Sequence, residues 1–147
     1  MLNRIDRGIM SAAIVAAPIF IAIVYFAGQV TPPFDPAWPL SYPKHFLFLI
    51  FLVPIIEEFF FRGTLQPYLL QKLSKSYLSG HLSLANLITS VLFAALHLLQ
   101  HSLLWSAATF FPSLIFGWLR ERTGKTWPAI ALHVYYNFSY FYLFNGL

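Results

Sequence analysis

The sequence predicts an all-α protein, a polytopic transmembrane helix bundle with about five spans. Of its 147 residues, 59% are hydrophobic and only 10% are charged, and the mean hydropathy is +0.67. Soluble domains carry about 25% charged residues. The apolar residues gather in runs that are long enough to cross a bilayer as helices, at about 1.5 Å per residue. We therefore expect a single membrane-embedded domain over residues 1–147.

The first span is expected from Gly8 to about Val30, where the apolar run is continuous. A cleaved signal peptide is the alternative, but its apolar region is only about 7–15 residues long, so we expect an uncleaved helix. The next segment, Thr31–Lys44, holds five prolines together with Trp38 and Tyr42. Because proline stops helices and aromatic residues suit the membrane interface, this segment is expected to be an outer loop.

The second span is expected from about His45 to Leu70. Pro54 lies inside it, which predicts a kink or freed backbone groups at that point. The polar segment Gln71–Leu82 follows as a loop. Three further apolar runs are expected to be spans: Ser83 to Leu99, Leu104 to Leu119, and Trp127 to Phe144.

The basic residues predict how these spans are oriented. They gather at the N-terminus, in the loop with Lys72 and Lys75, and in the segment Arg120–Lys125. Alternate crossing puts all three basic segments on one side, and the positive-inside rule makes that side cytoplasmic. We therefore expect a cytoplasmic N-terminus and an outer C-terminus. The net charge of +4 is read as a topology signal, and no nucleic-acid partner is expected.

Several catalytic designs are absent from the sequence. There are no cysteines, which excludes disulfides, thiolate metal sites and a cysteine nucleophile. There is no His-Glu-x-x-His zinc motif and no Gly-x-Ser-x-Gly nucleophile motif. No aspartate lies within an expected span, so an aspartyl dyad is excluded as well.

The second span instead carries two carboxylates and a guanidinium, Glu57, Glu58 and Arg62. A charged group near the centre of a bilayer costs at least about 2.5 kcal/mol, so such residues indicate a functional site. Glu58 and Arg62 stand four residues apart and can form an ion pair along one helix face. Glu57 lies about 100° around the helix and is left without that partner. A purely structural ion pair is the alternative, but it needs only one glutamate.

Three more polar residues fall within expected spans: His97, His133 and Asn137. A lone histidine in a membrane can simply bond a backbone carbonyl. The insertion cost of all these groups is relieved if they converge, and His133 and Asn137 share a helix face at a spacing of four. His81 and His101 lie near span ends and are expected to be interfacial.

These residue types fit the hydrolysis of an amide without a covalent intermediate. A glutamate with a nearby histidine can deprotonate water, and a histidine–asparagine pair can donate hydrogen bonds to a developing oxyanion. A zinc site remains the alternative, because His97, His101 and His133 with Glu57 would supply a His/carboxylate ligand set.

The order of three motifs resembles a known family, the CAAX-processing and bacteriocin-processing (CPBP, or Abi) intramembrane proteases. The family motifs are Glu-Glu-x-x-x-Arg, Phe-x-x-x-His and His-x-x-x-Asn. Here they read Glu57-Glu58-Phe-Phe-Phe-Arg62, Phe93-Ala-Ala-Leu-His97 and His133-Val-Tyr-Tyr-Asn137, and Phe116-Gly117 and Thr123-Gly124 between them also fit. The resemblance covers a catalytic core of about residues 46–144.

The resemblance implies an all-helical membrane core and a glutamate-type endopeptidase that needs no metal or other cofactor. Glu57 would match the base that activates water, with His97 assisting. His133 and Asn137 would match the pair that stabilises the oxyanion.

The resemblance further implies structural support from Glu58 and Arg62. The eukaryotic prenyl-protein proteases are larger, and the size of this chain is similar to small bacterial members that remove C-terminal sorting tails of the JDVT-CTERM type from exported proteins. The expected partners are therefore the lipid bilayer and a membrane-anchored protein or peptide with a C-terminal tail, and the expected location is a bacterial inner membrane.

Three other functions are compatible with the sequence. One is a zinc-dependent membrane hydrolase, and another is a non-catalytic membrane chaperone or immunity factor on the same scaffold. The third is a small proton-coupled carrier that uses Glu57 and His97 as a relay. The sequence leaves the substrate, the scissile bond and the oligomeric state open.

Overall fold

The computed structural model describes residues 4–26, 35–73, 77–79 and 82–144. These residues are almost entirely helical, which confirms the all-α class, and they form two compact units. One unit combines residues 1–54 with residues 134–147, and the other consists of residues 55–133. Lys75, His81 and the first four residues of the predicted loop Thr31–Lys44 lie outside the described residues.

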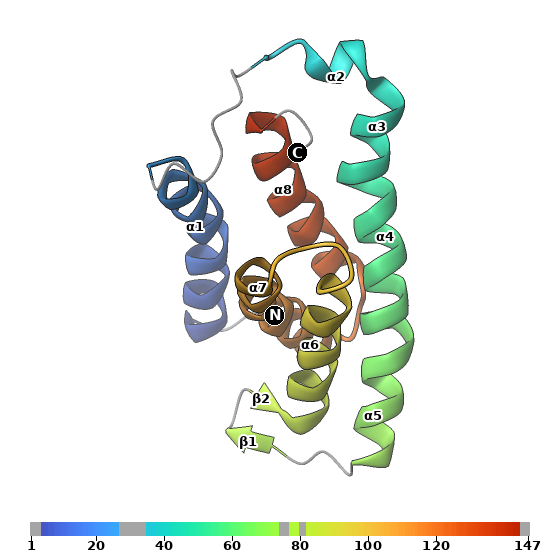
Figure 1. Cartoon of the computed structure of the whole chain (residues 1–147). Helices are drawn as coiled ribbons and strands as arrows, with labels where there is room; N and C mark the ends of the chain where they lie inside the picture. Colours follow the sequence, from blue (N-terminus) through green and yellow to red (C-terminus); the bar gives the residue numbers. More distant parts are fainter. Residues whose placement is uncertain (1–3, 27–34, 74–76, 80–81, 145–147) are drawn as a thin grey trace. The chain divides into compact units, whose positions relative to one another are not determined.

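The first unit begins with α1, a helix over Arg4–Phe26 that takes up most of the first expected span. Trp38 of the short helix α2 is buried, and its indole Nε1 donates to the carbonyl of Tyr142 at 3.1 Å. The other α-helices of this unit are labelled in Figure 1, and the unit also contains a π-helical segment. These elements are α2 (Trp38–Ser41), α3 (Pro43–Leu47), the π-helical η1 (Phe48–Leu52), the first residues of α4 (Val53–Glu58) and most of α8 (Trp127–Leu143).

The helix that was expected from about His45 to Leu70 is continuous from Pro43 to Lys72, but it is not uniform. Two π-helical segments interrupt it, each ending shortly before a proline. Pro54 follows η1, and Pro67 follows η2 (Phe59–Leu65) at the start of α5 (Gln66–Lys72). A proline ring inside a helix collides with the carbonyl four residues back, and a π turn relieves that collision by widening the backbone.

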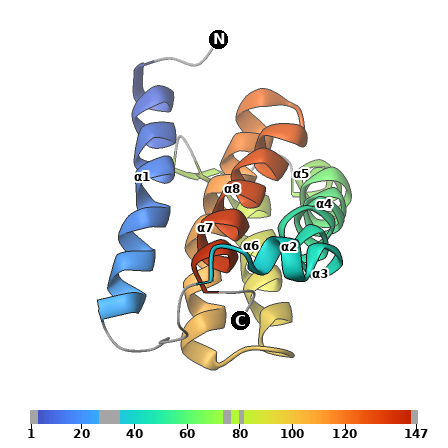
Figure 2. The same cartoon turned by 90° about the horizontal axis from the view of Figure 1, so that it is seen from above.

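In the second unit, α6 (Leu84–His97) and α7 (Leu103–Thr123) pack against each other side by side (Figures 1 and 2). Both helices begin at a serine whose side-chain oxygen accepts a backbone N–H, Ser83 for α6 and Ser102 for α7. Helix α7 ends at Gly124, whose φ of 70° suits glycine.

One part of the predicted loop Gln71–Leu82 is not irregular. Strands β1 (Tyr77–Ser79) and β2 (Leu82–Ser83) pair antiparallel directly before α6. The expectation of a plain loop was therefore wrong at this point. Backbone pairing over so few residues leaves no hydrophobic period for sequence analysis to detect.

Among the described residues, the structure contains no helix that combines the length and the apolar character needed to cross a membrane.

Helices α6 and α7 contact each other closely at Gly117. Asn86 of α6 is fully buried there, and its Nδ2 donates to the carbonyl of Leu114 at 2.9 Å. Ser90 donates to the Oδ1 of Asn86 at 3.2 Å. A Cβ atom at position 117 would lie 1.9 Å from that Oδ1, so only glycine leaves room for the buried amide.

We expect Gly117→Ala to destabilise the protein by about 1–3 kcal/mol, because the added methyl group displaces Asn86 and breaks its hydrogen bonds. Gly8→Ala is the matched control, since that glycine is also helical and has nothing within 4 Å of the added Cβ. Thermal unfolding in detergent measures both variants. A Gly117→Ala midpoint equal to or above that of Gly8→Ala would contradict this account of the packing.

Candidate active site

The ion pair expected between Glu58 and Arg62 is present and completely buried. The Nη1 atom of Arg62 lies 3.1 Å from the Oε1 atom of Glu58, and neither side chain has exposed surface. Glu58 ends α4 and Arg62 lies in η2, so the pair spans the change from α to π geometry. A buried pair of this kind needs further hydrogen bonds to offset the loss of water.

Arg62 receives those further contacts from α6 and α7. Its Nη2 donates to the carbonyl oxygen of Ser113 at 2.9 Å and also to the hydroxyl of the same serine. Its guanidinium carbon lies 4.8 Å from the ring centre of Phe93 and 5.5 Å from that of Phe116. A third ring, that of Phe61, is 5.7 Å away. The cation is therefore surrounded by aromatic faces, which attract it in the absence of water.

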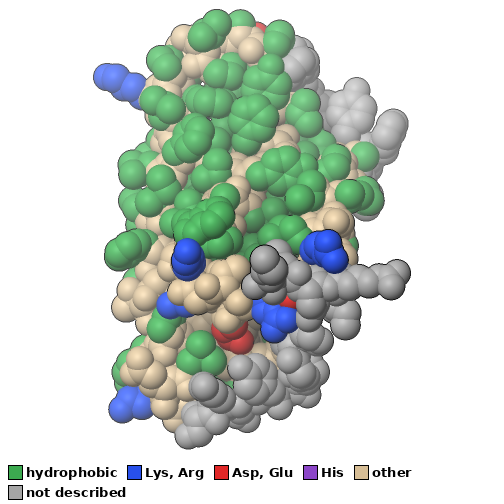
Figure 3. All heavy atoms as spheres, turned by 180° about the vertical axis from the view of Figure 1, so that it is seen from behind, with side chains coloured by type: hydrophobic (Ala, Val, Ile, Leu, Met, Phe, Trp, Pro, Cys, Tyr) green, Lys and Arg blue, Asp and Glu red, His purple; other side chains and the backbone are tan. Residues whose placement is uncertain are grey.

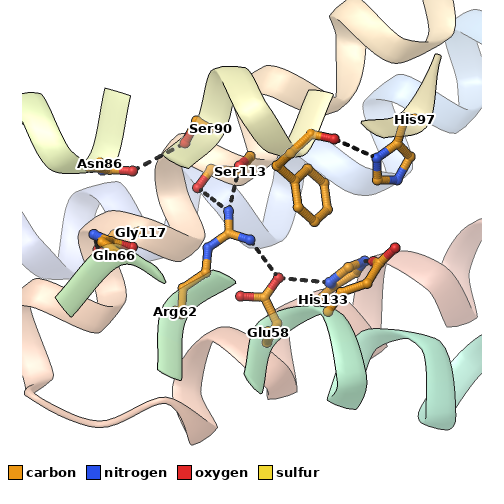
Figure 4. A network of polar contacts seen from close by, with 11 residues as sticks. Glu58, Arg62, Gln66, Asn86, Ser90, His97, Ser113, Gly117 and His133 are labelled. Atoms are coloured by element: carbon orange, nitrogen blue, oxygen red, sulfur yellow. Dashed lines mark hydrogen bonds and ion pairs between the residues drawn. The ribbon is translucent and has the colours of Figure 1, made fainter. Parts of the chain in front are cut away.

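His133 contacts both glutamates. Figure 4 shows its contact with Glu58. Its Nδ1 lies 3.0 Å from Oε1 of Glu58, and its Nε2 lies 3.7 Å from Oε2 of Glu57. The ring of Phe116 stacks on the imidazole at 4.9 Å between centres. Because a carboxylate only accepts hydrogen bonds, the contact with Glu58 places a hydrogen on Nδ1 and turns Nε2 toward Glu57.

Glu57 lacks Arg62 as a partner, as expected, and it contacts His133 instead. The helical spacing correctly excluded Arg62 as a direct ion-pair partner, since that cation pairs with Glu58. The partner of Glu57 comes from α8, 76 positions later in the chain, and no local spacing could indicate it. Glu57 keeps 21% of its side-chain surface exposed, whereas Glu58 keeps none. Glu57 is thus the carboxylate that a water molecule can reach.

His97 lies at the end of α6 and is held by its own helix. Its Nδ1 lies 2.9 Å from the carbonyl oxygen of Phe93, which places the hydrogen on Nδ1 and leaves Nε2 as the acceptor. The bond to Phe93 is the ordinary structural role of a membrane histidine. It also leaves Nε2 as the nitrogen that can accept a hydrogen bond from another group.

His101, expected to be interfacial, is exposed in the turn after α6. Its ring stacks on that of His97 at 6.0 Å and lies 6.0 Å from that of Trp105. Within the described residues, no group of three or more His, Asp or Glu side chains has an arrangement that could hold a metal ion.

Asn137 lies one turn after His133 along α8, and it belongs to the first unit. Its Nδ2 donates to the carbonyl oxygen of Leu49 in η1 at 2.9 Å. One hydrogen of the side-chain amide is therefore engaged, and the second hydrogen and Oδ1 are left for other contacts.

Sequence reasoning missed Ser113, which bonds Arg62 through both its backbone and its hydroxyl. A serine inside an apolar helix was the only available signal, and serines are common there. Phe116 was noticed only as part of a family pattern. Its stacking on His133 gives it a physical role in holding that ring.

One of three comparisons with known proteins found a match. No curated protein and no solved structure matches the chain. Residues 38–139 match the family described as type II CAAX prenyl endopeptidase Rce1-like. That match takes in all three motifs and more than half of the chain, which confirms the CPBP prediction. The protein therefore belongs to the Rce1-like family of CPBP membrane proteases.

Proposed function

We propose that the protein is a glutamate-type intramembrane endopeptidase that cuts a peptide bond near the C-terminal membrane segment of a protein substrate. The observation that carries this proposal is the arrangement of Glu57, Glu58 and His133. One carboxylate is fully buried and holds the imidazole, and the other is partly exposed on the far side of the same ring. Membership of a CAAX protease family supports the same class of reaction.

In the proposed reaction, Glu57 takes a proton from a water molecule, and the resulting hydroxide attacks the carbonyl carbon of the scissile bond. His97 assists through Nε2, since its Nδ1 is engaged by Phe93. The tetrahedral intermediate then collapses with cleavage of its carbon–nitrogen bond, and the proton that Glu57 has accepted passes to the leaving amine. Glu58 and Arg62 do not react, and they hold the groups that do.

The oxyanion that forms on the scissile carbonyl is assigned to His133 and Asn137. The contact of His133 with Glu58 sets a requirement for this role. Since Nδ1 already carries a hydrogen for Glu58, His133 can donate to an oxyanion only when Nε2 is protonated as well. Asn137 meets the requirement more simply, because its Nδ2 carries two hydrogens and Leu49 takes one of them.

A location in a membrane, with a substrate that is itself membrane-anchored, is supported by the distribution of polar residues. Large apolar side chains are exposed on several helices, and Figure 3 shows them over much of one face. The fully buried positions of the second unit include many polar side chains. They are Glu58, Arg62, Gln66, Ser83, Asn86, Thr89, Ser90 and Ser113. A surface of this kind suits lipid better than water. We propose a polytopic arrangement in a bacterial inner membrane.

We expect Glu57→Gln to lower the rate of peptide cleavage by at least about 100-fold while the protein stays folded, because the amide cannot accept the proton of water. A farnesylated CAAX peptide and a single-span protein with a C-terminal tail, both in detergent, serve as substrates. Gel filtration and the unfolding midpoint report on the fold. Wild-type cleavage rates in this variant would rule out Glu57 as the base.

Glu58→Gln is the matched variant, with the same chemical change one residue away. It should lower stability by about 3–5 kcal/mol and reduce the yield of folded protein, because it leaves the buried Arg62 without a counter-charge. A variant that remains as stable as the wild type and loses only activity would show that Glu58 takes part in the reaction itself.

The proposed mechanism does not use a metal ion, which separates it from the zinc alternative. We expect cleavage to survive prolonged treatment with a chelator, and we expect metal analysis of active protein to find less than about one zinc per chain, the minimum for a catalytic site. Stoichiometric zinc that is lost together with activity, and that restores activity when it is added back, would favour the zinc hydrolase.

The proposed orientation places the N-terminus in the cytoplasm and the C-terminus outside. A reporter enzyme fused after Leu147 should then be active only outside the cytoplasm, and one inserted near Ser76 only inside, because Lys72 and Arg120–Lys125 flank the inner ends of their helices. The reverse pattern at both positions would overturn the orientation.

A further inference from the structure

The carbonyl oxygen of Leu49 cannot receive the usual helical hydrogen bond. In η1 the N–H of Val53 donates to the carbonyl of Phe48, five residues back. In the same register, the carbonyl of Leu49 would receive the N–H of residue 54. That residue is a proline, which has no N–H to donate.

Asn137 supplies the missing donor from α8. Its Nδ2 lies 2.9 Å from the oxygen of Leu49, and the Asn137 side chain is only partly exposed. Pro54 is fully buried in the same unit of the structure. A carbonyl oxygen only accepts hydrogen bonds, so the contact also fixes which end of the amide faces η1.

The same arrangement occurs a second time in the other unit. In η2 the N–H of Gln66 donates to the carbonyl of Phe61, again five residues back. The next carbonyl, that of Arg62, would receive the N–H of residue 67, which is also a proline. The Nε of Arg120 donates to it instead, at 2.9 Å.

A third proline, in an α-helix without π turns, also leaves a carbonyl that a side chain satisfies. Pro18 lies inside α1, and the carbonyl four residues before it belongs to Ile14. The hydroxyl of Tyr135 on α8 donates to that carbonyl at 3.1 Å. In all three cases a proline removes a backbone donor, and a side chain from a distant helix replaces it.

The consequence differs for Asn137, because its amide has a second donor. The carboxamide group is planar, so an N–H that is held by Leu49 fixes the direction of the other N–H. Without the bond to Leu49, the amide would rotate about its terminal torsion, whose preference is broad. An oxyanion donor is effective only when its direction is set before the reaction.

We propose that Pro54 is a positioning residue for Asn137: it keeps the carbonyl of Leu49 free of a helical donor, so that this carbonyl orients the carboxamide. The structural part of this proposal, the coupling of Pro54 to Asn137, stands independently. The consequence for cleavage rests on the proposed function, in which Asn137 stabilises the oxyanion.

A double-mutant cycle on stability tests the structural part. Asn137→Ala should lower the unfolding midpoint by several degrees, on the order of 5 °C, because it leaves the oxygen of Leu49 without a donor. Pro54→Ala supplies an N–H at position 54. The change in unfolding midpoint that it causes should therefore be more favourable in the Asn137→Ala variant than in the wild type. Pro54→Val is the second version, because it supplies the same N–H with a volume close to that of proline.

Pro67→Ala combined with Asn137→Ala is the matched control. It adds an N–H after the other π-helical segment, in register with Arg62 rather than with Leu49. Its effect on the midpoint should be the same with and without Asn137. Additive midpoints for both Pro54 variants with Asn137→Ala, or equal coupling in the Pro67 control, would overturn the proposal.

The activity arm uses the same variants. Pro54→Ala should lower kcat by about tenfold to a hundredfold and leave KM within about twofold, because the oxyanion forms only in the transition state. It should cause no further loss in the Asn137→Ala background, since it acts through that residue. Coupled midpoints with an unchanged kcat would overturn the positioning role. Full activity of Glu57→Gln would overturn the proposed reaction and leave the stability cycle intact.

Discussion

The buried carboxylate of Glu58 is the interaction on which the rest of the site depends. Its Oε1 atom accepts hydrogen bonds from both Arg62 and His133, and its side chain has no exposed surface. A guanidinium buried in this way requires the contacts with Ser113 and the surrounding aromatic rings. The same carboxylate sets the tautomer of His133 and so decides which of its nitrogens faces Glu57.

A second constraint comes from the prolines. Each proline lacks a backbone N–H, so a carbonyl oxygen in the preceding turn of the helix has no helical hydrogen-bond donor. Pro54 and Pro67 each follow a π-helical segment, and each leaves one carbonyl to be satisfied by a side chain of another helix. In a medium without water, an unsatisfied carbonyl is costly, so these positions tie helices together. The same chemistry that packs the helices thereby also directs Asn137.

Much of this arrangement was predictable from local spacing. The helix expected from about His45 to Leu70 extends from Pro43 to Lys72, and the span expected from Leu104 begins at Leu103. The pairing of Glu58 with Arg62 followed from their separation of four residues. The short strands and the π-helical segments were not predicted, and the expected convergence of Glu57 with the histidines did not say which of them contacts it. Each of these features depends on backbone register or on contacts between distant parts of the chain.

The sequence by itself determined the chemical groups and their order, because motif residues and helical periodicity are properties of neighbouring positions. It also determined where backbone donors are missing, since each proline is visible in the sequence. Only the tertiary structure decided which group is the partner of each polar atom: His133 for Glu57, Ser113 for Arg62 and Asn137 for Leu49. The reason is that a buried polar atom pairs with whichever complementary atom the packing of the helices brings within hydrogen-bond or ion-pair distance, and that packing is a property of the whole fold.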